Sequence, residues 1–347
     1  MCTKNLYRCI EERLNYSRTG VSEHPYFILV NDYETEQKVN YLKSVGLAQR
    51  IPCGQCFECK TLKAKEWAFR CMKEASKYDN NIMITLTYDD DHLPHSENID
   101  IETGEVYSTL NKTDVVKFMK RLRKKYGEGI RFLMCGEYGS DNEYVTWKGE
   151  RKVGTSRPHY HIILFNFCPE DLVFHKWSKG EWSSEKYPLY KSESINKLWN
   201  KGFADCNEVT KESCEYVCRY TTKKLYGDFA KEEYEAKGRQ VPFLNMSRCP
   251  GIGFDYFVAN QDKFLKEQPM YLPSKKGLTQ INSIRYYDKQ LEKLYPDEFE
   301  KIKEKRISRI DNHWEQLLSK TDVYQFEYLA NLDAKSNSMQ KKLKRAL

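Results

Sequence analysis

Hydrophobic and polar residues alternate with helical or strand periods along most of the chain. Apolar residues recur at helical spacing over about residues 61–78 and again over residues 113–125, where the opposite face is rich in lysine and arginine. Runs of β-branched and aromatic residues predict strands at 26–30, 82–88, 131–137 and 159–165. This order of elements predicts an α+β domain in which helices cover one face of a largely antiparallel sheet.

At 347 residues the chain has room for about two domains, or for one large domain with appendages. We expect three parts: an N-terminal segment at residues 1–80 with a cysteine cluster and a helix, a central domain at residues 81–255, and an extension at residues 256–347. The extension is helical in pattern and basic. From Ala334 onward it contains no acidic side chain, and we expect this end to be flexible.

The charge balance is mildly basic, with 57 Lys+Arg against 50 Asp+Glu, and 14% of the residues are aromatic. This mixture suits a surface that pairs with phosphates and stacks bases, although a tyrosine-rich core with solvated lysines has the same composition. The mean hydropathy of -0.78 and the lack of a long apolar run argue against a membrane span, and the first residues lack the apolar region of a secretory signal. We therefore expect a soluble intracellular protein with reduced thiols.

Two histidines separated by one residue stand in the predicted strand at 159–165. Side chains two apart in a strand project from the same face, so His159 and His161 can together hold a divalent cation. If this strand pairs with the one at 131–137 as a hairpin, Glu137 lies near both imidazoles and completes a set that leaves open positions for substrate oxygens. A His-x-His strand can also carry two hydrogen-bonded structural rings, and taken alone the pattern favours that interpretation.

A helix that Thr210 can cap carries two tyrosines on one face. Tyr216 and Tyr220 are four residues apart, so their phenols lie one above the other, and Lys223 and Lys224 extend or flank the same stripe. A tyrosine hydroxyl has a pKa of about 10, so it needs a stabilised anion to act as a nucleophile near neutral pH. A nearby lysine and a metal that polarises a phosphate would supply that stabilisation. Two tyrosines at a contact between helix and sheet are the structural alternative.

A cysteine cluster precedes the first long helix. Cys53, Cys56 and Cys59 have Cys-x-x-Cys-x-x-Cys spacing, and Cys71 is a candidate fourth thiolate. Such spacing can form a structural zinc site that anchors the N-terminal segment. Typical zinc sites pair two separated units of this kind, so reduced thiols without a metal are an equal alternative.

Six motifs in order give the chain a family resemblance between about Pro52 and about Asp288. They are CGQCFEC (53–59), ITLTYD (84–89), CGEYG (135–139), RPHYH (157–161), YVCRYTTKK (216–224) and MSRCPGIG (246–253). With these motifs the sequence resembles the replication initiator proteins of small single-stranded-DNA bacteriophages, the gokushovirus branch of the Microviridae. Those proteins are similar to the wider HUH endonuclease (rolling-circle Rep) superfamily.

The resemblance implies a fold and a set of site residues. The fold would be HUH-type, related to RRM and ferredoxin-like domains, with a central antiparallel sheet flanked by helices, an N-terminal Cys-cluster segment and a helical C-terminal extension. Mg²⁺ or Mn²⁺ would be held by His159, His161 and Glu137 against the scissile phosphate of a single-stranded DNA origin.

The resemblance also implies a replication cycle. Tyr216 would attack first, leaving a 5′-phosphotyrosine and a 3′ hydroxyl that primes host DNA polymerase. Tyr220 would then attack the regenerated origin so that the displaced circle is resealed, with Lys223 and Lys224 beside the phenols. The implied partners are the origin, host polymerase and helicase, and the implied location is the bacterial host cytoplasm.

One stretch departs from the family pattern, and two other kinds of protein compete with this interpretation. Residues 140–156 form a longer connection than expected. A longer hairpin loop would preserve the ligands, whereas a shifted register would replace Glu137 by another carboxylate. The competing classes are an HUH transposase or relaxase and a non-enzymatic module that binds single-stranded nucleic acid. Paired tyrosines disfavour single-tyrosine transposases, and many relaxases have a third histidine.

Overall fold

The computed structural model describes residues 6–9, 26–54, 56–99, 104, 106–139, 143–145, 151–153, 156–179, 186–223, 232, 234–274 and 277–345. The chain forms two compact units: Met1–Lys63 with Glu292–Leu347, which we call the terminal unit, and Ala64–Leu291, which we call the sheet unit. The N-terminal and C-terminal segments, which we expected as separate parts, therefore contribute to one unit. Residues 64–80 and 256–291 belong to the sheet unit.

The terminal unit contains a small antiparallel sheet and helices from both ends of the chain. Its described elements are β1 (Leu6–Cys9), β2 (Tyr26–Leu29), α1 (Tyr33–Ser44), β3 (Ala48–Ile51), α10 (Pro296–Leu318) and α11 (Gln325–Arg345), with the strands in the order β2-β1-β3. Asp32 caps α1 by accepting a hydrogen bond of 2.8 Å from the Thr35 backbone. Lys43 of α1 forms an ion pair of 3.0 Å with Asp311 of α10. Helix α11 extends to Arg345, so this end is helical where we expected a flexible tail.

The sheet unit is built on a large antiparallel sheet. Within the described residues it has seven strands: β4 (Asn81–Tyr88), β7 (Arg131–Tyr138), β10 (Pro158–Phe165), β11 (Leu172–Lys179), β12 (Lys186–Ser192), β13 (Gly202–Asn207) and β14 (Phe243–Met246). Their order is β11-β12-β13-β4-β10-β7-β14, and each neighbouring pair is antiparallel. The sequence prediction of a mixed fold with a large antiparallel sheet is confirmed.

Helices and short hairpins surround this sheet. The helices are α2 (Phe57–Ala75), which begins in the terminal unit, α3 (Lys112–Tyr126), α4 (Glu193–Trp199), α5 (Lys211–Lys223), α7 (Phe254–Ala259), α8 (Gln261–Leu265) and α9 (Arg285–Leu294). The hairpins are β5 (His95–Ile99) with β6 (Val106–Ser108), β8 (Glu143–Val145) with β9 (Arg151–Val153), and β15 (Met270–Ser274) with β16 (Gly277–Ile281). The last hairpin lies in a region whose pattern we took as helical. No helix among the described residues is long and apolar enough to cross a membrane.

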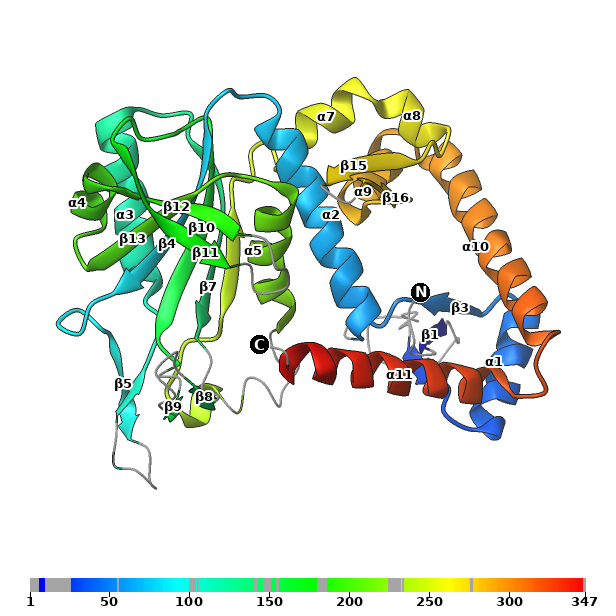
Figure 1. Ribbon diagram of the computed structural model, residues 1–347. Coiled ribbons are helices and arrows are strands. Elements are labelled where there is room, and N and C mark those ends of the chain that lie inside the picture. The colour runs from blue at the N-terminus through cyan, green and yellow to red at the C-terminus, as the bar shows by residue number, and fades with distance from the viewer. Residues whose placement is uncertain are drawn as a thin grey trace, which may run out of the picture. The chain divides into compact units, whose positions relative to one another are not determined.

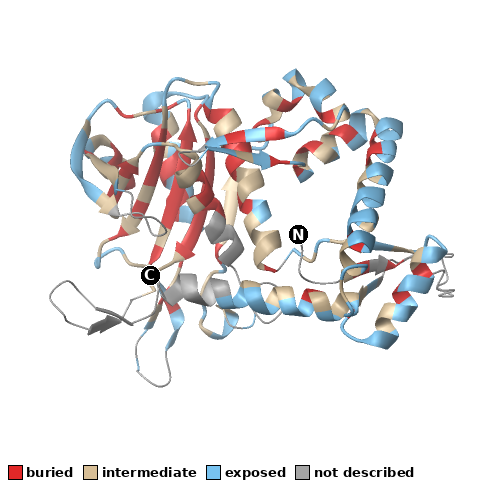
Figure 2. Ribbon diagram, turned by 45° about the vertical axis from the view of Figure 1, so that its right-hand side comes forward, coloured by how far each residue is buried: buried red, intermediate tan, exposed pale blue. Residues whose placement is uncertain are grey.

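Helices cover both faces of the sheet, whereas the sequence pattern predicted one covered face (Figure 1). On one face, Phe118 of α3 and Trp199 of α4 pack into the core that contains Ile162. On the other face, α5 contacts β7 and β10 and buries Cys214 completely. The reason is that β10 is apolar on both sides, since the adjacent Ile162 and Ile163 are both fully buried. Figure 2 shows the central strands as the most buried part of this unit.

The connection from α4 into β13 depends on a glycine. Asn200 ends α4 in the left-handed conformation, and Gly202 follows with φ of +139°. A Cβ atom at Gly202 would lie 2.4 Å from both the Asp89 nitrogen and the Thr87 carbonyl oxygen. These are backbone atoms of the neighbouring strand and its end, so they cannot move aside as a side chain can.

We predict that Gly202→Ala destabilises the protein by about 2 kcal/mol or more, because it adds a backbone clash to an unfavourable φ. The measurement is the shift of the urea midpoint. Gly139→Ala is the matched control, since its Cβ atom would meet nothing closer than 3.6 Å. Equal midpoints for the two variants would contradict this account of Gly202.

Candidate metal and tyrosine site

The pairing of β7 with β10 brings the three predicted metal ligands together. The two strands are antiparallel, and Glu137 lies directly opposite His159. The predicted hairpin is therefore confirmed, and the long connection preserves its register, because Pro158 still pairs with Tyr138. Within that connection β8 and β9 pair as a short hairpin. Glu137 thus remains the carboxylate of this group.

The ligand atoms of these side chains converge on one point. The Glu137 Oε1 atom lies 2.8 Å from His159 Nε2 and 3.1 Å from His161 Nε2. One ligand atom from each residue lies within 4.8 Å of the other two. Glu137 and His161 are buried, and His159 is partly exposed, so the group can be reached from solvent on one side.

The outer ring nitrogens are also held. His159 Nδ1 lies 3.1 Å from the Arg157 carbonyl oxygen, and His161 Nδ1 lies 2.9 Å from the Thr85 hydroxyl. A backbone carbonyl only accepts, so His159 has an acceptor at each ring nitrogen: Arg157 at Nδ1 and Glu137 at Nε2. A neutral imidazole has one N–H and can satisfy one of them. The other contact requires either an imidazolium or a cation between Nε2 and the carboxylate, so the donor set fits a bound metal ion.

The charge of Glu137 agrees with this arrangement. Burial acts to raise the pKa of its carboxyl group, but the hydrogen bonds from His159 and His161 outweigh burial and hold the pKa below the ordinary value. The group is therefore an anion near neutral pH. A buried anion between two imidazoles attracts a cation.

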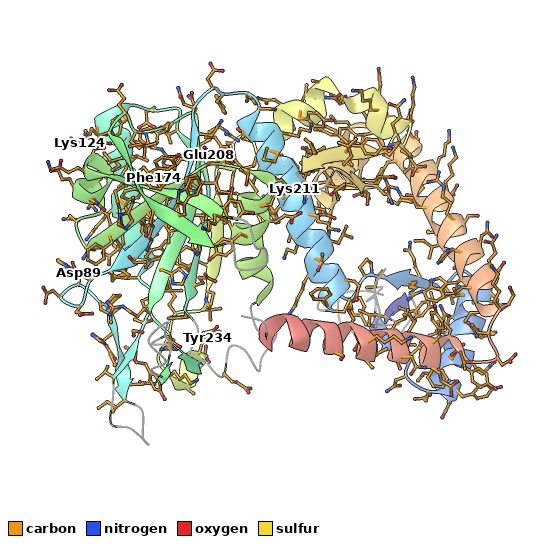
Figure 3. All side chains as sticks on the ribbon, viewed as in Figure 1. Asp89, Lys124, Phe174, Glu208, Lys211 and Tyr234 are labelled. Carbon is orange, nitrogen blue, oxygen red and sulfur yellow. The ribbon has the colours of Figure 1, made fainter. Side chains whose placement is uncertain are left out.

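Helix α5 carries Tyr216 to the same place. The Thr210 hydroxyl accepts a hydrogen bond of 3.1 Å from the Ser213 backbone, which caps the helix as predicted. Cys214 and Val217 are completely buried, so one stripe of α5 is fixed by packing. The Tyr216 ring lies beside that stripe, 5.2 Å from the His161 ring with an angle of 76° between the ring planes. Figure 3 labels Lys211 at the start of this helix.

The rest of the predicted tyrosine and lysine stripe is described only in part. Tyr220 and Lys223 belong to α5, but their side chains lie outside the described residues, as does all of Lys224. The structure thus brings Glu137, His159, His161 and Tyr216 together.

Three of the four predicted cysteine ligands are also close together. The sulfur atoms of Cys53, Cys56 and Cys59 lie within 4.8 Å of one another in the terminal unit. The Cys56 backbone N–H donates a hydrogen bond of 3.3 Å to the Cys53 sulfur. Cys59 stands in the first turn of α2, where the helix dipole favours a thiolate.

Cys71 is not part of this group. It lies about three turns further along α2, and its hydrogen-bonding partners are Cys214 and Cys218 of α5. Burial raises the pKa of the Cys218 thiol well above its ordinary value, which keeps that thiol neutral. The contact between α2 and α5 is therefore a packed cluster of buried thiols in the sheet unit.

Sequence reasoning missed two kinds of supporting residue. Thr85, which contacts His161, stands on a strand distant in sequence, and only the pairing of His161 with Thr85 across β10 and β4 reveals its role. The buried Glu74 accepts hydrogen bonds from Arg131 at 2.5 Å and from the Gly253 backbone at 2.7 Å. The motif at 246–253 thus braces β7 from outside the site, which gives it a structural role.

Fold and site together define an α+β protein that carries two histidines and a glutamate on an antiparallel sheet, beside a helix tyrosine. A sequence model of the replication-associated protein ORF2 family matches residues 81–225. Replication-associated protein ORF2 of Spiroplasma virus 4 is 32% identical over 311 residues, which cover 86% of this chain and 85% of that protein. Replication-associated protein VP4 of Bdellovibrio phage phiMH2K is 29% identical over 326 residues, covering 85% and 90%.

Replication-associated protein ORF4 of Chlamydia phage 1 is 29% identical over 227 residues, which cover 64% of this chain and 49% of that protein. No solved structure matches the chain. The chain belongs to the replication-associated (Rep) proteins of the Microviridae phages. The family resemblance carried by the six motifs is thereby confirmed, and with it a role in phage DNA replication.

We predict that Thr85→Val weakens Mn²⁺ binding about tenfold, because it removes the hydroxyl that orients His161. Isothermal titration of the purified protein with Mn²⁺ measures this. Thr87→Val is the control, since Thr87 lies on the same strand and its hydroxyl donates to the Phe203 carbonyl instead. Unchanged Mn²⁺ affinity in Thr85→Val would remove Thr85 from the support of the site.

Proposed function

We propose that this protein initiates rolling-circle replication by nicking, and later resealing, the single-stranded DNA origin as an HUH-type tyrosine endonuclease. The observation that carries the proposal is the position of Tyr216, whose ring lies 5.2 Å from that of His161 in the group that includes Glu137. A helix-borne phenol beside a candidate divalent-metal site is the arrangement that metal-dependent phosphoryl transfer to tyrosine requires.

Glu137, His159 and His161 would hold Mg²⁺ or Mn²⁺, because one carboxylate and two imidazoles suit such ions and leave coordination positions open. When bound, the cation would polarise the scissile phosphate and offset the charge that develops on its oxygens. Thr85 and the Arg157 carbonyl hold the two rings with both Nε2 atoms turned toward Glu137. The protein therefore contributes a site whose ligands are oriented in advance.

Tyr216 is the proposed first nucleophile. Its hydroxyl oxygen forms a bond to phosphorus while the bond from phosphorus to the 3′ oxygen breaks, which leaves a 5′-phosphotyrosine and a free 3′ hydroxyl. The phenol gives up its proton and the departing 3′ oxygen takes one up. One phosphodiester replaces another, so ATP is not needed, and the sequence has no Gly-x-x-x-x-Gly-Lys-Ser/Thr loop.

Tyr220 is the proposed second nucleophile, which attacks the regenerated origin after one circuit. The released 3′ hydroxyl then attacks the first phosphotyrosine, frees Tyr216 and closes the displaced circle. Lys223 and Lys224 follow in the same motif and would stabilise the phenolates. Host DNA polymerase and helicase in the bacterial cytoplasm would extend the first 3′ hydroxyl and unwind the template.

Two alternatives make different demands on the same residues. The names of the relatives speak of replication, which favours an initiator over an HUH transposase or relaxase. A non-enzymatic module for single-stranded nucleic acid would use the tyrosines for stacking and the histidines as structural groups. Against that module, Glu137 is a buried anion that two imidazoles surround, which suits a cation and does nothing for stacking.

We predict that the wild-type protein, with Mn²⁺ and an origin oligonucleotide, forms a covalent adduct that survives SDS electrophoresis. Tyr216→Phe/Tyr220→Phe forms none, because neither ring then has a hydroxyl to attack phosphorus, and Tyr216→Phe alone slows the first cleavage more than Tyr220→Phe alone. Tyr126→Phe, which alters a phenol on α3, keeps full activity. An adduct with the double variant would exclude these tyrosines from the chemistry.

We further propose that Cys53, Cys56 and Cys59 supply three thiolates of a structural zinc site in the terminal unit. The support is their mutual distance within 4.8 Å and their position at the start of α2. A tetrahedral zinc site takes one further ligand, and Cys71 is engaged with Cys214 and Cys218. Such a site would tie the loop before α2 to the helix itself.

We predict about one zinc per chain in protein purified without chelator, measured by elemental mass spectrometry. Cys53→Ser/Cys56→Ser loses this zinc and unfolds at lower temperature, because two of the thiolates are gone. Cys249→Ser, at an exposed cysteine of the sheet unit, retains it. Wild-type protein without zinc would leave these cysteines a packing role alone.

A further inference from the structure

An exposed aromatic ring stands in the same row of the sheet as the candidate metal ligands. Phe203 of β13 pairs with Thr87 of β4, Thr87 pairs with His159 of β10, and His159 pairs with Glu137 of β7. Directly paired residues of antiparallel strands point to the same face. Because neighbouring strands lie about 4.8 Å apart, Phe203 is about 10 Å across the sheet from His159.

This part of the sheet face is open, whereas the part next to it is covered. On the same face of β7 and β10, Leu133 and Ile163 are completely buried, and α5 contacts both strands. The Phe203 side chain is 58% exposed, and Val173 at the sheet edge is also exposed. The face of the sheet beside the ligands thus presents a flat apolar ring to solvent.

The charges around Phe203 favour a nucleic-acid strand over a cationic partner. The Lys191 ammonium lies 5.9 Å from the Phe203 ring centroid and 2.8 Å from the Asp205 carboxylate. Asp205 pairs with Thr85 on β4, so this carboxylate stands in the row that contains His161. Lys191 neutralises it, and a phosphate in this row meets an ion pair and threonine hydroxyls.

We propose that Phe203 stacks against a base of the single-stranded DNA that flanks the phosphate at the Glu137, His159 and His161 site. The inference rests on the proposed function, since it assumes that the strand is held at that site. Base stacking on an exposed aromatic ring tolerates any sequence, because every base has a π face. A base inside a duplex has both faces covered by its neighbours, so the ring selects unpaired DNA.

The test measures binding without cleavage. Fluorescence anisotropy of a labelled thymidine oligonucleotide on the order of 20 nucleotides, with full-length protein in EDTA, gives the affinity in the absence of divalent metal. Phe203→Leu is expected to bind about tenfold more weakly, and Phe203→Trp at least as tightly as wild type, because the indole restores a stacking surface. A duplex of the same length is expected to respond little to either substitution.

Phe174→Leu is the matched control. Phe174 is 49% exposed on β11, and it pairs through Tyr190 with Cys206, whose side chain lies in the core on the opposite face (Figure 3). Its loss is expected to change the affinity less than twofold. Unchanged binding by Phe203→Leu, or an equal loss in Phe174→Leu, would overturn the inference. Because the assay involves no cleavage, a wild type that binds through Phe203 yet forms no tyrosine adduct would refute only the proposed chemistry.

Discussion

The buried carboxylate of Glu137 is the group on which the candidate site depends. An anion removed from water costs several kcal/mol unless an opposite charge and hydrogen bonds compensate for it. The compensation comes from His159 and His161, whose Nε2 atoms lie 2.8 and 3.1 Å from one carboxylate oxygen. A divalent cation between these atoms would satisfy all three at once, and without one an imidazolium must carry the positive charge.

This constraint extends to the sheet. Glu137 and the two histidines come from neighbouring strands, so they meet only in one register of β7 against β10. A slip of one residue would turn every side chain of a strand to the opposite face. The apolar residues on both faces prevent such a slip, since Ile162 belongs to the core under α3 and α4 while Ile163 is buried on the opposite face. The same packing that forms the core therefore holds the ligands in place.

Local patterns in the sequence predicted much of the site, and non-local pairing explains what they missed. The strands, the hairpin with Glu137 beside His159, and the capped helix with Tyr216 could be predicted because each depends on residues close in sequence. Thr85 and Phe203 reach the site through strands whose neighbours cannot be known before the sheet order is known. Cys71 fits the cysteine spacing in sequence, but the helix that contains it directs the thiol toward Cys214 and Cys218. The joint terminal unit was missed for the same reason, because its two segments lie at opposite ends of the chain.

The packing of α5 bears on how two tyrosines would share one metal site. Residues four apart in a helix are displaced by about 6 Å along its axis, so one phenol at a time can take the position that Tyr216 has beside His161. The helix is held by Cys214, Val217 and Cys218, which are completely buried, and sliding it by a turn would break that packing. The DNA strand is bound through its phosphate and exposed rings and can be reseated at lower cost. In the proposed cycle, therefore, the second attack follows a movement of the strand along a stationary helix.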